Sequence, residues 1–301
     1  MIWDPRHLPS QVGKTVVVTG AGRGIGYFAA EQLAAAGARV ILTTRGETAA
    51  IDQLRSRVPS GSCELVTLEL GSLASIRTAA TALAALGPID VLVNNAGKTS
   101  GSRRREVTSD GLEIMVGTNA YGPFALTALL FPSITGRIIN LGSLSTRLAT
   151  ADLSDFEQAR GRYSVSRAYA YSKHGVHAFS FELDRRLSAS GSSVSSILAH
   201  PGWAVNGNSS ARPGVTDRNS ALQRIAERAL RPVAHGKDRG AWPVVRAAID
   251  PDAAGGEFYG PARSVTGPPV LTKPVAQSAD PAFGAEFWRL AEAATGVSFE
   301  L

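Results

Sequence analysis

Short apolar runs alternate along the chain with longer, alanine-rich stretches. The apolar runs predict strands, at residues 15–20, 39–45, 63–70, 89–97, 137–143 and 194–202. The alanine-rich stretches between them predict helices, near residues 24–36, 47–57, 73–86, 110–131 and 167–189. The chain is therefore expected to repeat strand–helix units from its first strand onward.

The predicted strands show which kind of sheet they form. Their apolar residues run on without strict alternation, as in residues 89–97, which is typical of strands buried on both faces of a parallel sheet. Strands that alternate with helices at this pitch predict right-handed crossovers. We therefore expect one α/β domain over residues 1–301, a Rossmann-type doubly wound parallel sheet with helices on both faces. The last hundred residues should add a substrate lid at 203–232 and a closing strand and helix.

Composition restricts the function classes. Hydrophobic residues make up 44% of the 301 positions and charged residues 19%, which is typical of a globular protein. The 31 Lys and Arg against 25 Asp and Glu give a net charge of +6. Because arginine is scattered and no zinc-knuckle, basic-zipper or RNP-like pattern occurs, we expect anionic ligands rather than nucleic acid. The single cysteine, Cys63, excludes an intramolecular disulfide and a cysteine-based zinc cluster.

Other segments bear on metals and location. His174 and His177 lie on one predicted helix without a third ligand at metal-binding spacing, so no metal site is expected. No apolar stretch of signal-peptide length precedes the first predicted strand, and we expect no run of about 18 residues to be apolar enough to span a membrane. We therefore expect a cytoplasmic protein without a membrane span. The sequence leaves both a monomer and a homo-oligomer open.

A glycine-rich turn follows the first predicted strand. Gly20, Gly24 and Gly26 stand in TGAGRGIG, between that strand and a helix. There the chain must turn sharply and let backbone N–H groups approach a pyrophosphate. The spacing departs from G-x-G-x-x-G, so the glycines alone leave open a turn that merely permits close packing of helix on sheet.

The end of the second predicted strand bears on which dinucleotide binds. Enzymes that use NAD place an acidic residue there, against the ribose hydroxyls of the adenosine. This chain has Thr44 and Arg45 instead. A guanidinium pairs with a 2′-phosphate through charge-assisted hydrogen bonds, and Arg23 adds a second cation to the same pocket. NADP is therefore favoured over NAD.

Candidate catalytic side chains come later in the chain. Ser143 ends the fifth predicted strand, and Tyr169 and Lys173 follow on the next major helix at i and i+4. This spacing puts the phenol and the ammonium on one helical face. A nearby cation favours phenolate, which predicts a lowered pKa for Tyr169 and a role in acid–base catalysis. Such a pair is common on its own, but its position after a strand-end serine makes it specific.

These motifs together carry a resemblance to a known family. TGAGRGIG, NNAG at 94–97, Ser143, Tyr169-x-x-x-Lys173 and HPG at 200–202 occur in the order typical of short-chain dehydrogenases/reductases. The chain most resembles the retinol-dehydrogenase-like branch, through GKTVVVTGA, VGTNAYGPFALTALLFP, AYAYSKHG and FWRLAEAATGVSF. The resemblance extends from about residue 10 to residue 299. It implies an NADP(H)-dependent oxidoreductase that reduces a ketone or aldehyde, or oxidises the matching alcohol, by hydride transfer.

The resemblance also implies roles for single residues. Tyr169 would exchange a proton with the substrate oxygen, Lys173 would hold the nicotinamide ribose and lower the pKa of Tyr169, and Ser143 would hydrogen-bond the substrate carbonyl. Asn119, in GTNAYG, matches the helix asparagine that anchors a proton-relay water. Glu69 stands where aspartate is commoner, so we expect a poorer contact with the adenine. Cofactor contacts are implied for Gly20, Arg23, Gly24, Ile25, Gly26, Arg45, Asn95, Ala96, Gly97, Tyr169, Lys173, Pro201, Gly202 and Ala204.

Two other functions remain open. The same fold and Tyr–Lys pair serve non-redox proton transfer in an epimerase, dehydratase or cyclase, and a non-catalytic NADP-binding sensor would need only the fold. Four intact catalytic positions argue against the sensor. The substrate is expected to be a small carbonyl or alcohol compound, and its identity is not readable from the chain. Arg103, Arg104 and Arg105 predict an exposed loop beside the cleft, either merely solvated or a rim that steers an anionic or carrier-bound substrate.

Overall fold

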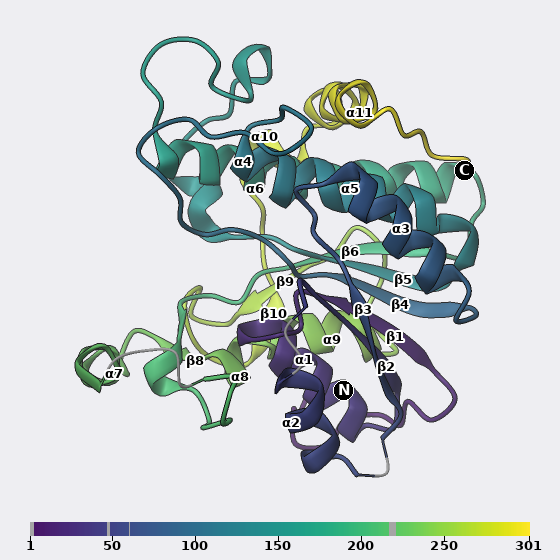
Figure 1. The fold of residues 1–301 in the computed structure, drawn as a ribbon, viewed down its shortest axis with the longest axis vertical. Helices are drawn as coiled ribbons and strands as arrows, with labels where there is room; N and C mark the ends of the chain where they lie inside the picture. The colour runs from purple at the N-terminus through teal and green to yellow at the C-terminus, as the bar shows by residue number, and fades with distance from the viewer. Residues whose placement is uncertain (1–2, 47–48, 60, 217–220) are drawn as a thin grey trace.

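The computed structural model describes residues 3–46, 49–59, 61–216 and 221–301 (Figure 1). Within these residues, eight strands form one sheet in the order β10-β9-β6-β5-β4-β1-β2-β3. Neighbouring strands are parallel except for β10, which runs antiparallel to β9 at the sheet edge. The strands span Thr15–Thr19 (β1), Arg39–Thr44 (β2), Cys63–Thr67 (β3), Ile89–Asn94 (β4), Ile134–Leu141 (β5), Ser195–Ala199 (β6), Phe258–Pro261 (β9) and Pro269–Leu271 (β10).

Helices cover both faces of this sheet (Figure 1). One layer contains α1 (Gly24–Ala35), α2 (Ala49–Arg57) and α9 (Trp242–Ile249). The opposite layer contains α3 (Leu73–Ala84), α5 (Gly122–Leu130), α6 (Val165–Ala189) and α11 (Pro281–Thr295). The predicted doubly wound α/β fold is confirmed.

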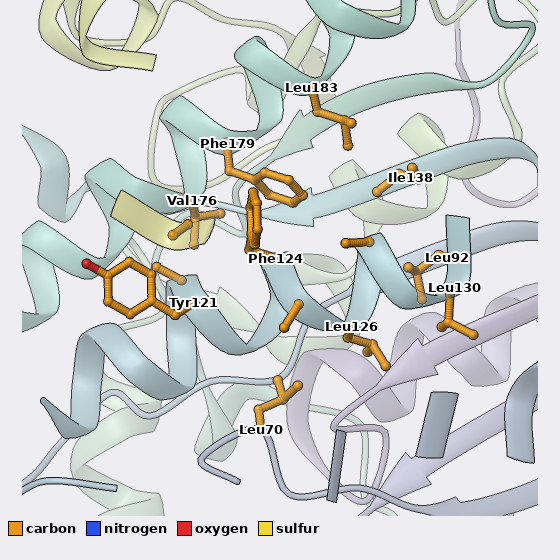
Figure 2. Packing of buried hydrophobic residues seen from close by; sticks show 14 of the residues in the cluster. Leu70, Leu92, Tyr121, Phe124, Leu126, Leu130, Ile138, Val176, Phe179 and Leu183 are labelled. Atoms are coloured by element: carbon orange, nitrogen blue, oxygen red, sulfur yellow. The ribbon is translucent and has the colours of Figure 1, made fainter. Parts of the chain in front are cut away.

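Each central strand contributes to both layers. In β1, Val17 joins one buried cluster and its neighbours Val16 and Val18 join the other. Successive side chains of a strand point to opposite faces, and here both faces are apolar because both are covered. On the face shown in Figure 2, Phe124 of α5 packs edge to face against Phe179 of α6, with ring centroids 5.4 Å apart.

The predicted helix 110–131 begins later and is not uniform. Its first turn, α4 (Ile114–Val116), starts after Glu113, whose carboxylate accepts from the N–H groups of Met115 and Val116 at 3.0 and 2.8 Å. A π-helical turn (Gly117–Tyr121) follows and leads into α5. An acidic side chain that satisfies free N–H groups fixes where a helix starts. That is why the helix does not extend back to residue 110.

This helical stretch also bears on the expected lack of a membrane span. Residues Ile114–Ser133 are long and apolar enough to cross a membrane by length and composition, with a mean hydropathy of 1.4. The sequence-based expectation overlooked them. In the fold, 83% of the most apolar window is buried inside the protein, among contacts with α3, α6 and α11.

The predicted lid, 203–232, is described in part, since residues 217–220 lie outside the described residues. It starts with β7 (Ala204–Val205), which pairs with β8 (His235–Gly236), and contains α7 (Ala221–Ala229) (Figure 1). Arg212 ties the segment to α1, because its guanidinium donates to both carboxylate oxygens of Glu31 at 2.8 and 2.7 Å. Whether this segment covers a substrate stays a prediction.

Candidate active site

The carboxyl end of β5 and the first turns of α6 bring the predicted catalytic side chains together. Ser143 follows β5 in extended backbone and caps a short 3-10 helix by accepting from the N–H of Ser145 at 3.1 Å. Helix α6 begins after Ser164, whose hydroxyl accepts from the N–H of Arg167. Tyr169 therefore lies in the second turn of α6, with its phenol close enough to the Ser143 side chain for Ser143 to favour the phenolate.

Burial controls the proton on Tyr169. Burial raises the pKa of the phenol, and the nearby Ser143 side chain offsets this only in part. The predicted lowering by Lys173 is wrong for this structure, because desolvation of the phenolate outweighs every opposing interaction. The phenol therefore stays protonated at neutral pH.

Lys173 is buried against the sheet. Lys173 is only 5% exposed, and its ammonium donates to the carbonyl oxygen of Leu141 at 2.6 Å. Burial lowers the pKa of Lys173 to about 8. The Lys173 ammonium thus lies at the last residue of β5, Leu141, which stands two positions before Ser143 in the chain. Lys173 and Tyr169 therefore both face the end of this strand, as their shared helical face predicts.

His177 is a site residue that the sequence analysis did not identify. Its Nε2 accepts from the backbone N–H of Ser143 at 3.2 Å, while Nδ1 is buried without a partner among the described residues. Burial holds the pKa of His177 well below its ordinary value. Its position four residues after Lys173 and eight after Tyr169 could have revealed it, because all three share one helical face.

Asn119 lies in the π-helical turn and joins two parts of the site. Its Oδ1 accepts from the N–H of Lys98 at 2.7 Å, and its Nδ2 donates to the Lys98 carbonyl at 2.9 Å and to Ser172 Oγ at 3.0 Å. Ser172 Oγ in turn donates to the carbonyl of Tyr169 at 2.8 Å. The amide therefore holds the loop after β4 against the catalytic helix. Single π-helical turns are frequent at functional sites.

The glycine turn packs directly on the loop after β4. Gly20 has a φ of +64°, and a Cβ there would lie 2.8 Å from Ala96 Cα. Asn95 Nδ2 donates to the carbonyl of Thr19 at 2.7 Å, and the Thr19 hydroxyl accepts from the N–H of Ala96 at 2.9 Å. Thr19, which the sequence analysis passed over, thus fixes the two loops together. Gly26 lies against Asn95 too closely for any side chain.

Arg45, predicted to meet a 2′-phosphate, has a carboxylate beside it. Its side chain is 58% exposed and lies 3.7 Å from Glu69 Oε2. The other oxygen of Glu69 accepts from the N–H of Gly71 at 2.9 Å, which holds the carboxylate in place. The sequence analysis considered Glu69, which follows β3, only as a contact of the adenine, so it missed the pair with Arg45. Arg23 is exposed at the start of α1.

The loop after β6 carries the predicted nicotinamide contacts. Gly202 has a φ of +65°, and a Cβ there would collide with the carbonyl of Val265. Its N–H donates to His200 Nδ1 at 3.2 Å, and His235 Nε2 donates to the carbonyl of Pro201 at 2.7 Å. Two buried histidines therefore fix the backbone of this loop.

Known proteins with similar sequences have the same family assignment. The family model for short chain dehydrogenases matches residues 14–205. The chain belongs to this family. It is similar to polyprenol dehydrogenase from Mus musculus, with 35% identity over 271 residues that cover 83% of this chain and 76% of the relative. Retinol dehydrogenase 13 from Homo sapiens shares 39% identity over 201 residues, 64% of this chain and 59% of the relative. The predicted retinol-dehydrogenase-like branch is confirmed.

Solved structures agree with this assignment. An uncharacterised protein from Mycobacterium paratuberculosis shares 32% identity, with a TM-score of 0.82 and 99% of each chain covered. The angucycline C-6 ketoreductase LanV with bound NADP shares 25% identity, with a TM-score of 0.64 over 84% of this chain and 95% of that one. This short-chain dehydrogenase therefore has the family's Rossmann-type fold and belongs to a family of oxidoreductases.

The arginine cluster of this short-chain dehydrogenase is only partly as predicted. Arg103 and Arg104 are exposed, but Arg105 is half-buried and pairs with Glu157, at 3.1 Å to the carboxylate and 2.9 Å to the carbonyl. Glu157 also accepts from the N–H of Glu113 at 2.8 Å. Three exposed arginines were expected because no partner was visible in sequence, and Glu157, from the segment between Ser143 and Tyr169, supplies one.

The two histidines of α6, His174 and His177, form hydrogen bonds with other parts of the protein. His174 Nε2 donates to the carbonyl of Ala149 at 2.7 Å, and its Nδ1 accepts from Ser278 Oγ at 2.8 Å. Among the described residues, no group of three His, Cys, Asp or Glu side chains is placed to hold a metal ion. Cys63 is free and buried.

Proposed function

We propose that this protein is an NADP(H)-dependent oxidoreductase that reduces a ketone or aldehyde, or oxidises the matching alcohol. The observation that carries the proposal is that Ser143, Tyr169 and buried Lys173 come together at the end of β5, where Lys173 donates to the carbonyl of Leu141 and the Ser143 side chain acts on the Tyr169 phenol. Two hydroxyl groups that face one another at the end of a parallel sheet can both donate to one carbonyl oxygen.

The cofactor site fits a dinucleotide. The turn at Gly20 leaves no room for side chains and exposes backbone N–H groups at the start of α1, where phosphates bind. A bound nicotinamide would supply or accept the hydride. The residues proposed to hold the dinucleotide are Gly20, Arg23, Gly24, Ile25, Gly26, Arg45, Asn95, Ala96, Gly97, Tyr169, Lys173, Pro201, Gly202 and Ala204.

The proposal of NADP rather than NAD rests on charge. Arg45 directly follows β2 and Arg23 directly precedes α1, positions that would suit a 2′-phosphate, and the ketoreductase LanV was solved with NADP. Glu69 partly neutralises Arg45 and repels a phosphate. The preference for NADPH is therefore expected to be moderate.

Proton transfer falls to Tyr169. Its raised pKa keeps the phenol protonated, which is the form needed to protonate the oxygen of a carbonyl undergoing reduction. Ser143 would donate to the same oxygen and hold it in place. Lys173 would hold the ribose next to the Leu141 carbonyl, and Asn119 would anchor the water from which the proton is replaced.

We also propose that segment 203–232 covers the substrate. Trp203, which directly follows the Pro201–Gly202 loop, is 46% exposed and offers an apolar surface beside the cofactor. Polyprenol and retinol dehydrogenases, the named relatives, are consistent with an apolar alcohol or carbonyl substrate.

The test is a substrate screen with the purified protein. NADPH oxidation is followed with a panel of ketones and aldehydes, and NADP⁺ reduction with the matching alcohols, while products are identified by chromatography. We expect net hydride transfer with at least one class of compound. Conversion of a substrate without net oxidation or reduction of the nicotinamide would instead identify an epimerase, dehydratase or cyclase.

A further inference from the structure

A lysine from late in the chain lies over the glycine turn. Lys237 is the first residue of α8 (Lys237–Gly240). A Cβ placed on Gly24 would lie 3.5 Å from Lys237 Cδ and 3.6 Å from its Nζ. Gly24 is the first residue of α1, so the ammonium lies beside the end of that helix where N–H groups are free.

Within the described part of the chain, the Lys237 ammonium forms no ion pair at 4.0 Å or less. The backbone N–H of Lys237 donates to Ser209 Oγ at 2.9 Å. Burial lowers the pKa of Lys237; the negative charge of Glu227 opposes this, and the positive charge of Arg23 lowers the pKa further. A part-buried cation that faces another cation is unfavourable unless an anion binds between them.

Hydrogen bonds fix Lys237 relative to α1. Gln32 of α1 donates through Nε2 to the carbonyl of Asp238 at 3.0 Å. The Asp238 carboxylate accepts from Ser210 Oγ at 2.7 Å. The lysine is thus held over the turn by α1 itself and by the segment that precedes α7.

We propose that Lys237 is a phosphate-binding residue of the cofactor site. It would bind a phosphate of the dinucleotide together with Arg23 and the N-terminus of α1, as a compact positive charge at the edge of the turn. This rests on the proposed function in that the ligand is a dinucleotide. The phosphate is either the pyrophosphate, common to both nicotinamide cofactors, or the 2′-phosphate of NADPH.

Binding measurements without any substrate test this. The dissociation constants of NADPH and NADH are determined by calorimetry for the native protein, Lys237→Ala, Lys237→Arg and the control Arg239→Ala. Arg239 has the same charge on the same short helix but lies over the Trp242 ring, 5.7 Å from its centroid. We expect Lys237→Ala to weaken binding about tenfold or more at low salt, the size of a lost charged hydrogen bond. Lys237→Arg should lose less, and Arg239→Ala should match the native protein.

The two cofactors identify the phosphate. An equal loss for NADPH and NADH assigns Lys237 to the pyrophosphate, and a loss confined to NADPH assigns it to the 2′-phosphate; both support the proposal. Thermal unfolding of the cofactor-free proteins separates binding from structure. Removing an unpaired ammonium should leave the Tm unchanged or raise it, and Lys237→Gln replaces the alanine variant if that variant does not fold.

Dissociation constants of Lys237→Ala within twofold of native for both cofactors would overturn the inference. If the native protein binds neither cofactor, the proposed function fails instead. Inorganic pyrophosphate, titrated into native protein and Lys237→Ala, then decides separately on Lys237. A weaker affinity of the variant supports the phosphate site, and equal affinity overturns it.

Discussion

The backbone N–H of Ser143 donates its hydrogen bond to Nε2 of His177, two turns of α6 beyond Tyr169. His177 thereby orients the residue whose hydroxyl meets the Tyr169 phenol. His177→Leu should leave the Ser143 N–H without a partner and lower the free energy of unfolding by about 1–3 kcal/mol. We also expect kcat to fall roughly tenfold to a hundredfold, since small displacements of catalytic groups are costly.

Chemical denaturation and steady-state kinetics with a substrate from the screen check this. His177→Gln, which keeps a side-chain acceptor, is the matched control and should lose less of both quantities. A fully active His177→Leu enzyme would show that Ser143 is oriented without the histidine.

Tyr169→Phe should reduce turnover by about a hundredfold or more, because only the proton-transferring hydroxyl is removed. Cofactor affinity, measured by calorimetry, should stay within about twofold of the native value because the ring remains. Tyr171→Phe is the control: Tyr171 stacks on Phe156 with ring centroids 6.0 Å apart, away from Ser143. A Tyr169→Phe rate above about a tenth of native would exclude the phenol as the proton donor.

Arg45 and Glu69 together should set the cofactor preference. Arg45→Asp places two carboxylates where a 2′-phosphate would bind, so the ratio of NADH to NADPH dissociation constants should fall about tenfold to a hundredfold. Glu69→Gln removes the competing carboxylate and should raise the same ratio. Equal native affinities for NADH and NADPH would refute the proposed NADP dependence.

Buried histidines should make the protein sensitive to acid. Burial lowers the pKa of His200 to about 4, and burial also lowers the pKa values of His177 and His235. Below the unfolded-state pKa of about 6.5, the unfolded chain therefore binds protons that the folded protein excludes. Stability should be full above pH 6.5 and fall towards pH 4, by about 3 kcal/mol for His200 alone.

Denaturant unfolding between pH 4 and 8 measures this slope. His200→Gln should flatten it. His7→Gln is the control at an exposed position, since the side chain of His7 is 81% exposed. Stability that stays constant from pH 8 to pH 4 would contradict the buried, neutral state of these side chains.

Local patterns were enough to find the core of the site. Gly20, Ser143, Tyr169 and Lys173 could be predicted because strand ends and helical spacing fix their positions within a few residues. The π-helical turn around Asn119 could not, because its apolar pattern does not differ from that of an α-helix.

Residues that reach the site through tertiary contacts were also missed. Glu69 comes to Arg45 from the loop after the neighbouring strand, Glu157 comes to Arg105 from the segment between Ser143 and Tyr169, and Lys237 reaches the turn from a distant helix. No spacing in the sequence connects the members of such pairs. The raised pKa of Tyr169 has the same origin, since burial depends on the whole fold.

The side-chain amide of Asn119 connects the loop after β4, which is proposed to bind the cofactor, with the helix that carries Tyr169. It holds the loop of Lys98 on one side and, through Ser172, the backbone of Tyr169 on the other. A nucleotide that orders this loop therefore also orders the start of α6, before any carbonyl compound arrives. We expect the two ligands to bind in a compulsory sequence, the nucleotide first, with the carbonyl compound bound more tightly by the loaded protein than by the empty one.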